Sequence, residues 1–399
     1  MPELPKCDVE VQYILDGGAL LQLIPWPRGA TFAAIIRSYV QFVQHRFQNA
    51  TVVFDGYNSG PSTKDVTHIR RAKGKCSPKV VFKPEMSLQA RKDVFLSNKK
   101  NKQRFINLLS EALAANLCPT VCADGDADCM IVAQALESSK TQVTIVVGDD
   151  TDLLVLLCHH ASDNHRDIFL EPSHRTSTKT VKLWNIRHTR CLGSLCQVLP
   201  VIHAVSGCDT TSRPFGVGKR SAFRKFQRSK ELKSLASMFL TDCTPSNSTE
   251  AGEKILVSLY DGTSPDCLDD LRYNMFCTKV AGGTSFLQMH CLPPTSAAAK
   301  YHSLRVYLQV QEWAGTVLEP QDWGWKTAGD NLVPCTTDLP PAPSKLLSVI
   351  RCNCKSDCDT KRCSCRKHGL DCSSACGECH GLECSNAYVM CADENDTDD

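Results

Sequence analysis

The sequence of 399 residues contains no run of uncharged apolar residues that approaches the ~18 needed to span a membrane. Its first residues, MPELPKCDVEVQYILDGG, lack the basic start and apolar core of a secretory signal. The excess of positive charge is small as well, because the chain has 45 Lys and Arg and 43 Asp and Glu, for a formal net charge of +2. These absences argue against a membrane-spanning or secreted protein, and net charge alone indicates no partner.

Cysteine is abundant and unevenly distributed. Of the 24 cysteines, ten fall between Cys352 and Cys391, and the others are mostly isolated in apolar contexts. Isolated buried thiols are typical of a reducing compartment, and we expect a nuclear protein. A hydrophobic content of 42% with 22% charged residues excludes disorder for most of the chain.

Short apolar runs alternate with helix-length segments over the first 230 residues, which predicts an α/β fold with a mostly parallel central sheet and helices on both faces. The predicted strands are Val11–Leu15, Thr51–Phe54, Pro119–Cys122, Val143–Val147 and Asp167–Leu170. The predicted helices between them are Thr31–Phe47, Leu88–Asn116 and Asp126–Ser139.

The rest of the chain divides by composition. We expect a first domain over 1–230, a mainly helical extension over 231–333 that includes a helix at Ala297–Trp313, and a proline-rich linker over 334–350. A cysteine-rich module over 351–386 and an acidic, disordered tail over 387–399 follow.

Aspartates follow the predicted strands. One such residue is usually a turn former or a helix N-cap, but parallel strands bring their carboxyl ends to one crevice. Like charges gathered there require a cation or protonation, and carboxylates without His or Cys select Mg²⁺ or Mn²⁺. Two such ions would suit hydrolysis of a phosphodiester. The aspartates are Asp16, Asp55, Asp124, Asp126, Asp128, Asp149, Asp150, Asp152 and Asp209.

The order YILD, VVFDG, DGDADC, GDDTD and SGCD, followed by a glycine hairpin, resembles the flap-endonuclease/XPG branch of the PIN-like nucleases over residues 10–230. The resemblance implies a PIN-like fold, two Mg²⁺ or Mn²⁺ ions and a set of catalytic, metal-binding acids. It gives no role to Asp128 or Asp149, and the pair Asp124 and Asp126 stands where the family usually has two Glu. The implied acids are Asp16, Asp55, Asp124, Asp126, Asp150, Asp152 and Asp209.

Two basic segments are candidates for binding nucleic acid. The segment from Phe215 to Ser221 resembles the hairpin of the family's helix–hairpin–helix, here near 210–228, with Gly216, Gly218, Lys219 and Arg220 at the backbone phosphates. Residues 61–110 hold 13 Lys and Arg against three acids, a net of +10. A solvated charged face is the plainer interpretation. Because the segment lies between two predicted active-site strands, as the helical gateway of flap endonucleases does, the resemblance favours a phosphate-binding surface that contains Lys64, Arg70 and Arg71.

The cysteine block has the spacing CxCx3Cx4CxCx6Cx3Cx2Cx4C. A disulfide knot is disfavoured in a reducing compartment, whereas nine thiolates, six terminal and three bridging, can hold three Zn²⁺ ions at four ligands each. We expect His368 and His380 not to be ligands and Cys391 to be a free thiol. The nine cysteines are Cys352, Cys354, Cys358, Cys363, Cys365, Cys372, Cys376, Cys379 and Cys384.

This block resembles a CXC domain of the tesmin type, a small zinc-cluster module that binds DNA. Arg362 stands where those proteins commonly have a tyrosine, and arginine suits a narrow minor groove. A pre-SET zinc cluster is the competing interpretation, weakened because no methyltransferase domain follows. The resemblance therefore implies DNA as a partner of residues 351–386.

Together, these patterns predict a two-metal nuclease that acts on DNA or RNA, most plausibly a structure-specific DNA nuclease. The alternative is a catalytically inactive PIN-like DNA-binding or chromatin scaffold protein of mobile-element origin. A phosphatase of the haloacid-dehalogenase type is disfavoured, because the segment from Asp16 to Ala19 lacks the nucleophile motif DxDx(T/V).

Overall fold

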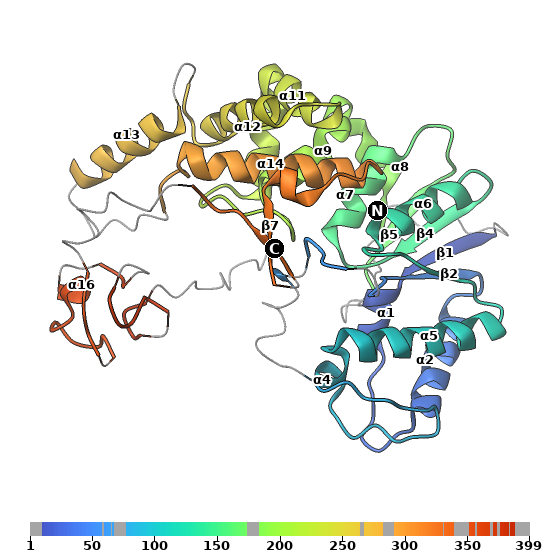
Figure 1. The fold of residues 1–399 in the computed structure, drawn as a ribbon. Coiled ribbons are helices and arrows are strands. Elements are labelled where there is room, and N and C mark those ends of the chain that lie inside the picture. The colour runs from blue at the N-terminus through green and yellow to red at the C-terminus, as the bar shows by residue number, and fades with distance from the viewer. Residues whose placement is uncertain are drawn as a thin grey trace.

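The computed structural model describes most of the chain (Figure 1). Among the helices of the described ranges, none is both long enough and apolar enough to cross a bilayer. Most of the predicted linker and most of the predicted acidic tail lie outside the described residues. The described residues are 10–57, 60–64, 66–67, 77–173, 183–263, 267–281, 291–329, 331–338, 351–355, 357–367, 370–372, 376–382 and 384–387.

One mostly parallel sheet organises the first half of the molecule (Figure 1). Its strand order is β3-β2-β1-β4-β5-β6, and only the edge strand β6 is antiparallel to its neighbour. The strands are β1 (Val11–Asp16), β2 (Ala50–Phe54), β3 (Thr120–Cys122), β4 (Val143–Val147), β5 (Ile168–Glu171) and β6 (Trp184–Asn185). The predicted fold class is confirmed, with bounds of the five predicted strands within one residue of those observed.

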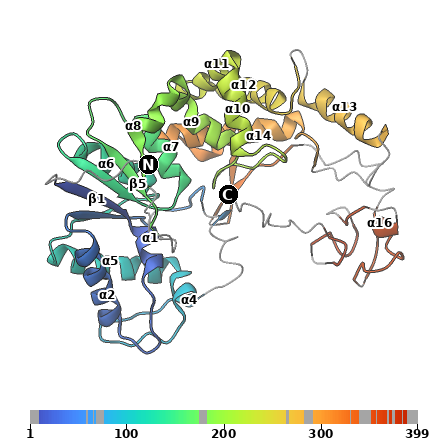
Figure 2. The ribbon, with the colours of Figure 1, turned by 180° about the vertical axis from the view of Figure 1, so that it is seen from behind.

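Helices cover both faces of the sheet (Figures 1 and 2). Successive side chains of a strand point to opposite faces, so Ile14 and Val53 pack with one helical layer whereas Leu15 and Val52 pack with the other. The first layer contains α6 (Asp128–Ser138), α7 (Thr151–His160) and α9 (Ser194–Val205). The second contains α1 (Gly17–Leu23), α2 (Phe32–Arg46), α4 (Lys92–Leu96) and α5 (Lys99–Ala115).

The helical extension continues the first layer instead of forming a core of its own. Helix α14 contacts α9 and α12 (Figure 2), and buried side chains of all three belong to one hydrophobic cluster. Gly252 permits the close approach of α12 to α14, because a Cβ there would lie 2.0 Å from Ser303 Oγ. Helix α10 (Lys219–Arg228) precedes the extension. The helices of the extension are α11 (Lys230–Ser237), α12 (Pro245–Leu259), α13 (Leu268–Ala281) and α14 (Ser296–Trp313).

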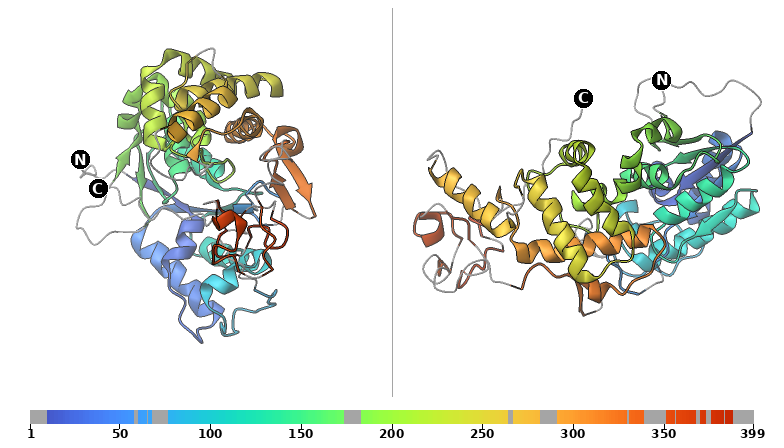
Figure 3. Two further views of the ribbon diagram at one scale, coloured as in Figure 1. Left: turned by 90° about the vertical axis from the view of Figure 1, so that its left-hand side faces the viewer. Right: turned by 90° about the horizontal axis from the view of Figure 1, so that it is seen from above.

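A short hairpin and a cysteine-rich segment complete the described chain. Figure 3 shows the hairpin of β7 (Trp325–Ala328) and β8 (Asn331–Pro334) beside α14. There Trp323 stacks on Tyr307 with ring centroids 4.3 Å apart. The cysteine-rich segment contains one short helix, α16 (Ser364–Lys367).

The predicted single helix Leu88–Asn116 is wrong, because two helices, α4 and α5, occupy this range. The break is caused by capping: Asn98 Oδ1 accepts hydrogen bonds from Lys100 N at 3.0 Å and Asn101 N at 3.2 Å, which starts a new helix. The Asn98 amide also donates to Ser77 O at 2.8 Å. Asn98 thus starts α5, whereas at the end of α4 the hydroxyl of the C-cap residue Ser97 donates to Val94 O at 2.6 Å.

Gly17 allows β1 to turn directly into α1, and we predict that Gly17→Ala destabilises the protein. A Cβ at this position would lie 2.2 Å from Phe54 Cδ1 and 2.7 Å from Val53 O, so we expect a loss of about 1–3 kcal/mol in urea unfolding. Gly60→Ala is the matched control, because a Cβ there meets no heavy atom within 4 Å. A Gly17→Ala protein as stable as wild type would contradict the close approach, since alanine otherwise favours a helix.

Candidate active site

The sheet order places a crevice between β1 and β4. The connection from β1 leads to β2 on one side, whereas β4 continues to β5 on the other, and ligands of open α/β sheets bind where the order reverses in this way. A cleft of about 440 Å³ lies there, lined by Asp16, Asp55, Asp126, Asp128, Asp150 and Asp209. A larger groove of about 650 Å³ between α2 and α5 contains no such group of acids.

Asp16 ends β1 and caps α1. Its Oδ1 accepts hydrogen bonds from Gly18 N at 2.7 Å and Ala19 N at 3.2 Å. Burial raises the pKa of Asp16 from 3.8 to about 6, and the nearby charges of Asp55 and Asp150 contribute to the rise. A carboxylate held in this way favours a cation at its second oxygen.

Asp55 follows β2 and carries its own network. The Tyr57 hydroxyl donates to Asp55 Oδ2 at 2.6 Å, and Ala127 N donates to Asp55 Oδ1 at 3.2 Å. Lys102 of α5 donates to the Tyr57 hydroxyl, and its Nζ lies 3.9 Å from Asp55 Oδ2. Burial lowers the pKa of Lys102, whereas the charges of Asp55 and Asp16 oppose that change. A lysine and a tyrosine are thereby fixed beside the carboxylates.

Lys64 links two acids at the start of α6. Its Nζ lies 2.5 Å from Asp126 Oδ2 and 3.2 Å from Asp128 Oδ2, and its side chain is only 16% exposed. Burial raises the pKa of Asp128 well above its usual range, and Asp126 adds to this effect while Lys64 opposes it. Carboxylates crowded to this degree need positive charge close by.

The segment after β4 supplies two further acids. Asp150 caps α7, with its Oδ1 accepting from Asp152 N at 2.9 Å. Burial would raise the pKa of Asp152, but the hydrogen bond from His203 together with the positive charges of Lys64 and Lys219 outweighs burial and lowers it. Oxygens of Asp128, Asp150 and Asp152 lie within 4.8 Å of one another and could hold an ion. An all-carboxylate set suits Mg²⁺ or Mn²⁺.

Asp209 reaches the cleft on a loop that other elements hold in place. The Thr67 hydroxyl donates to Asp209 O at 2.7 Å. On the other side, Thr210 donates to the Gln309 amide oxygen of α14, and His302 of α14 contacts Val205 O at 3.1 Å. The helical extension therefore takes part in positioning the loop that carries Asp209.

The structure brings most of the expected acids together but exchanges one. Asp124 is exposed and does not line the cleft, where Asp128 lies instead. The cause is the turn after β3: Gly56 N donates to Gly125 O at 2.8 Å, and α6 then begins at Asp128. The spacing in the sequence does not distinguish the two pairs, because Asp124, Asp126 and Asp128 are each two residues apart.

Asp149 has a different environment from its neighbour Asp150. Its carboxylate accepts hydrogen bonds from Ser173 N at 2.8 Å and from the Ser173 hydroxyl. It therefore ties the end of β4 to the chain that follows β5. This structural role agrees with the absence of an assigned role in the sequence pattern.

The predicted nucleic-acid-binding residues have mixed positions. Arg70 and Arg71 lie outside the described residues, and Lys64 contacts the acids. Gly216 adopts a φ of +75°, and Gly218 is the N-cap residue of α10. Lys219, the residue after Gly218, directs its ammonium to His203 and Gly207 O. Arg220, the next residue, and Arg362 of the cysteine-rich segment are exposed.

Sequence pattern alone assigns no role to Tyr57, Lys102 or His203. Tyr57 follows the FDG segment and Lys102 lies among many basic residues, so neither is distinguished from its neighbours. His203 lies in the apolar segment VIHAV, where a satisfied core histidine is the ordinary expectation. Only the packing of α5 and α9 against the carboxyl edge reveals these three contacts.

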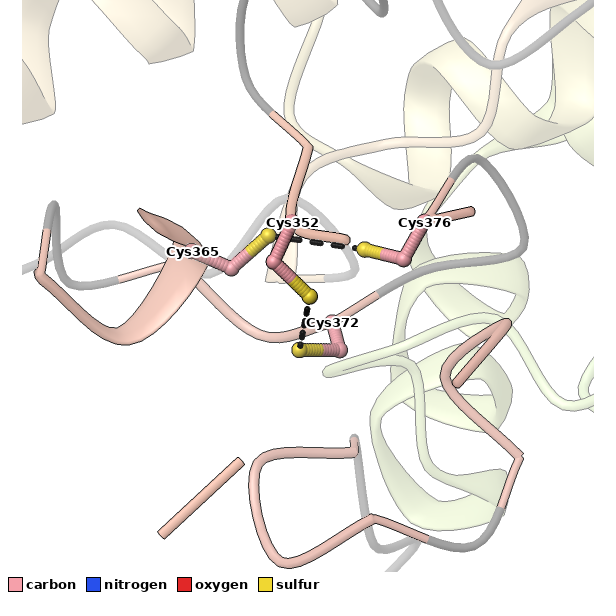
Figure 4. A group of neighbouring side chains, drawn as sticks. All are labelled: Cys352, Cys365, Cys372 and Cys376. Atoms are coloured by element: carbon pink, nitrogen blue, oxygen red, sulfur yellow. Dashed lines mark hydrogen bonds between the residues drawn. The ribbon is translucent and has the colours of Figure 1, made fainter. Parts of the chain in front are cut away.

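The cysteine-rich segment contains three overlapping groups of four thiols. Each group has sulfur atoms within 4.8 Å of one another, and Figure 4 shows one of them. In it, the Cys352–Cys372 sulfur distance is 3.8 Å and the Cys365–Cys376 distance is 3.5 Å, so no disulfide joins either pair. The groups are Cys352, Cys365, Cys372 and Cys376; Cys352, Cys358, Cys363 and Cys372; and Cys358, Cys372, Cys379 and Cys384.

Comparisons with known proteins give structural matches only. No protein-family model and no curated protein sequence matches the chain. A flap endonuclease of bacteriophage T5, in complex with DNA and metal ions, is 14% identical with a TM-score of 0.37, over 77% of this chain and 100% of that one. The catalytic core of Rad2 with a DNA substrate is 14% identical with a TM-score of 0.37, over 76% of this chain and 88% of that one.

A third match is the eukaryotic junction-resolving enzyme GEN-1, at 14% identity and a TM-score of 0.35, over 76% of this chain and 60% of that one. Similarity at these values does not identify an activity. The function of this chain therefore has to be argued from its own residues.

We predict that Asp16 makes the stability of the protein depend on pH. Because folding raises the pKa of Asp16 from 3.8 to about 6, the folded protein holds this proton more tightly than the unfolded chain does. The side chain therefore costs no stability below about pH 4, and its cost is complete above about pH 6. Asp16→Asn should thus be about 1–3 kcal/mol more stable than wild type at pH 7.5 and equally stable near pH 4.

The measurement is urea unfolding without added Mg²⁺ or Mn²⁺ at both pH values. Asparagine can still cap α1, so loss of the cap does not obscure the result. Asp322→Asn, at an exposed position, should show no pH-dependent difference from wild type. A difference for Asp16→Asn that is constant between pH 4 and 7.5 would contradict the prediction.

Proposed function

We propose that this chain is a divalent-metal-dependent nuclease that hydrolyses phosphodiester bonds of DNA. The observation that carries the proposal is the convergence of carboxylates from the ends of β1, β2, β4, the start of α6 and the loop at Asp209 on one cleft. Mg²⁺ or Mn²⁺ bound there would lower the pKa of a water and neutralise the leaving oxygen. Two ions, as the family resemblance implies, would serve both purposes.

The cations of the cleft supply the affinity for a phosphate. Lys64 and Lys102 lie beside the carboxylates, and Lys99 also lines the cleft. Ammonium groups near a scissile phosphate bind its oxygens and stabilise the charge that develops on them. The basic segment 61–110 and exposed Arg220 would extend this contact along the nucleic acid backbone.

A catalytically inactive DNA-binding or chromatin scaffold protein of mobile-element origin is the second candidate. One observation favours it: Lys64 contacts both Asp126 and Asp128, so part of the negative charge is compensated without a divalent ion. The three ammonium groups of the cleft, those of Lys64, Lys99 and Lys102, do not balance six carboxylates, however. A metal-dependent nuclease therefore explains more of the residues that line the cleft than a scaffold protein does.

We also propose that the cysteine-rich segment is a CXC-type module with three Zn²⁺ ions. Cys352, Cys358 and Cys372 are each shared between groups, as bridging thiolates would be. Because Zn²⁺ takes four ligands, two bridging and two terminal thiolates would complete each ion. The proposed terminal pairs are Cys365 with Cys376, Cys379 with Cys384, and Cys363 with Cys354.

Cys354 is the ninth ligand in this arrangement. Its side chain packs against the buried cysteines, although it belongs to none of the three groups. Exposed Lys361, Arg362 and Arg366 lie beside the buried thiols and would contact DNA. Recruitment to DNA through this module suits a nuclear protein.

The test of the nuclease is cleavage of a labelled panel of flap, single-stranded and duplex DNA and RNA with Mg²⁺ or Mn²⁺. We expect metal-dependent cutting, and a loss of about 100-fold or more in the double variant Asp150→Asn/Asp152→Asn. Asp149→Asn is the matched control, because this neighbouring acid bonds Ser173 instead of lining the cleft. No cutting by folded, zinc-loaded protein would favour the scaffold.

Two single variants distinguish the possible positions of the acid pair. We expect Asp128→Asn to reduce cleavage more than Asp124→Asn does, because of these two residues only Asp128 lines the cleft. The reverse order would support the pair that the family resemblance implies.

Zinc content tests the proposed cluster independently of cleavage. We expect three zinc ions per chain by elemental analysis, and loss of most of this zinc in Cys372→Ser, because Cys372 belongs to all three groups. Cys391→Ser, outside the spacing pattern, should retain three. Fewer than three zinc ions in the wild type, or full zinc in Cys372→Ser, would overturn the shared cluster.

A further inference from the structure

His203 lies between a candidate metal ligand and the glycine hairpin. The histidine is on α9 and only 5% exposed. Its Nε2 lies 2.6 Å from Asp152 Oδ1, and Lys219 Nζ lies 3.0 Å from its Nδ1. Lys219 also donates to Gly207 O at 2.7 Å, which holds the ammonium in place.

These contacts determine which ring nitrogen carries the proton. An ionised carboxylate can only accept hydrogen bonds, so the ring nitrogen that faces Asp152 must carry a proton. Lys219 Nζ lies 3.0 Å from Nδ1 and 3.4 Å from Nε2, so the ammonium lies over the face of the ring and holds the imidazole in place. His203 therefore donates the proton on Nε2 to Asp152 Oδ1.

We propose that His203 is a positioning residue that fixes the carboxylate of Asp152 for a divalent cation, and that the ammonium of Lys219 holds the imidazole in place. This inference rests on the proposed metal site. A donor on Oδ1 holds the carboxylate in one orientation and leaves Oδ2 for the ion, close to the oxygens of Asp128 and Asp150. Partners behind a ligand commonly contribute 10–100-fold to metal affinity.

The arrangement gives Lys219 a role that differs from direct phosphate binding. Lys219 is the first residue of α10 and immediately follows Gly218, so its backbone belongs to the hairpin while its ammonium orders the acid site. The position of the hairpin and the orientation of Asp152 are therefore mechanically connected. Arg220, the residue after Lys219, is exposed.

The first test measures Mn²⁺ binding to the full-length, zinc-loaded protein by electron paramagnetic resonance, without nucleic acid. We expect His203→Leu to bind Mn²⁺ about 10–100-fold more weakly than wild type. His203→Gln should retain most of the affinity, because a glutamine amide can replace the Nε2 donor. His159→Leu is the matched control, because this half-buried histidine contacts Cys196 O and not the acids.

The second test observes the donated proton directly. Long-range ¹H–¹⁵N correlation spectra, with the His203 signals assigned by their loss in His203→Gln, should show a proton on Nε2. Lys219→Met should bind Mn²⁺ more weakly because the imidazole loses the cation packed on its face, whereas Lys219→Arg should preserve the affinity. A wild-type His203 without a proton on Nε2 would overturn the proposal.

The outcomes separate this proposal from the nuclease itself. If wild type binds Mn²⁺ and folded His203→Leu binds it equally well, the positioning role is wrong while the metal site stands. If wild type binds no Mn²⁺, both are wrong. Thermal unfolding of each metal-free variant shows that a loss of affinity is not a loss of fold. If His203→Leu does not fold, His203→Phe, which keeps a ring but no donor, provides the answer.

Discussion

Repulsion between carboxylates at the carboxyl edge of the sheet is the constraint to which the surrounding structure responds. Parallel strands bring Asp16, Asp55 and Asp150 to one crevice, and no apolar packing can offset several unpaired buried charges. Three kinds of group compensate this charge. Backbone N–H groups at helix N-termini donate to Asp16 and Asp150. Lys64 of the basic segment and Lys102 of α5 lie beside the carboxylates, and His203 of α9 contacts Asp152. A divalent cation would complete this compensation.

The helical extension also helps to position the acids of the cleft. Helix α14 packs against α9 and α12, and its Gln309 holds the loop next to Asp209. Elements far apart in the sequence, from β1 to α14, therefore meet around one cleft, and the hydrophobic cluster runs from the sheet into the extension without interruption. A local change in α14 is thus expected to reach the acid site through packing, although its residues do not touch a ligand.

Much of this could be predicted from the sequence, because short apolar runs set the strands and parallel strands must align their carboxyl ends. The strand bounds and the gathering of Asp16, Asp55, Asp126 and Asp150 follow from those two facts. What escaped prediction depends on contacts between distant segments. The choice of Asp128 over Asp124 is made by the turn that Gly56 anchors, the inward direction of Lys219 by Gly207, and the helix break by Asn98.

Cys372 belongs to every thiol group of the cysteine-rich segment, and this sharing has a thermodynamic consequence. Because each pair of proposed zinc positions shares one bridging thiolate, the three positions cannot fill independently, and the first ion organises thiolates that the next two need. Loading becomes cooperative, so a limited supply of zinc would yield a mixture of empty and full modules instead of partly filled ones. The segment would then report zinc availability as a threshold, and its attachment to DNA would be gained or lost as a single event.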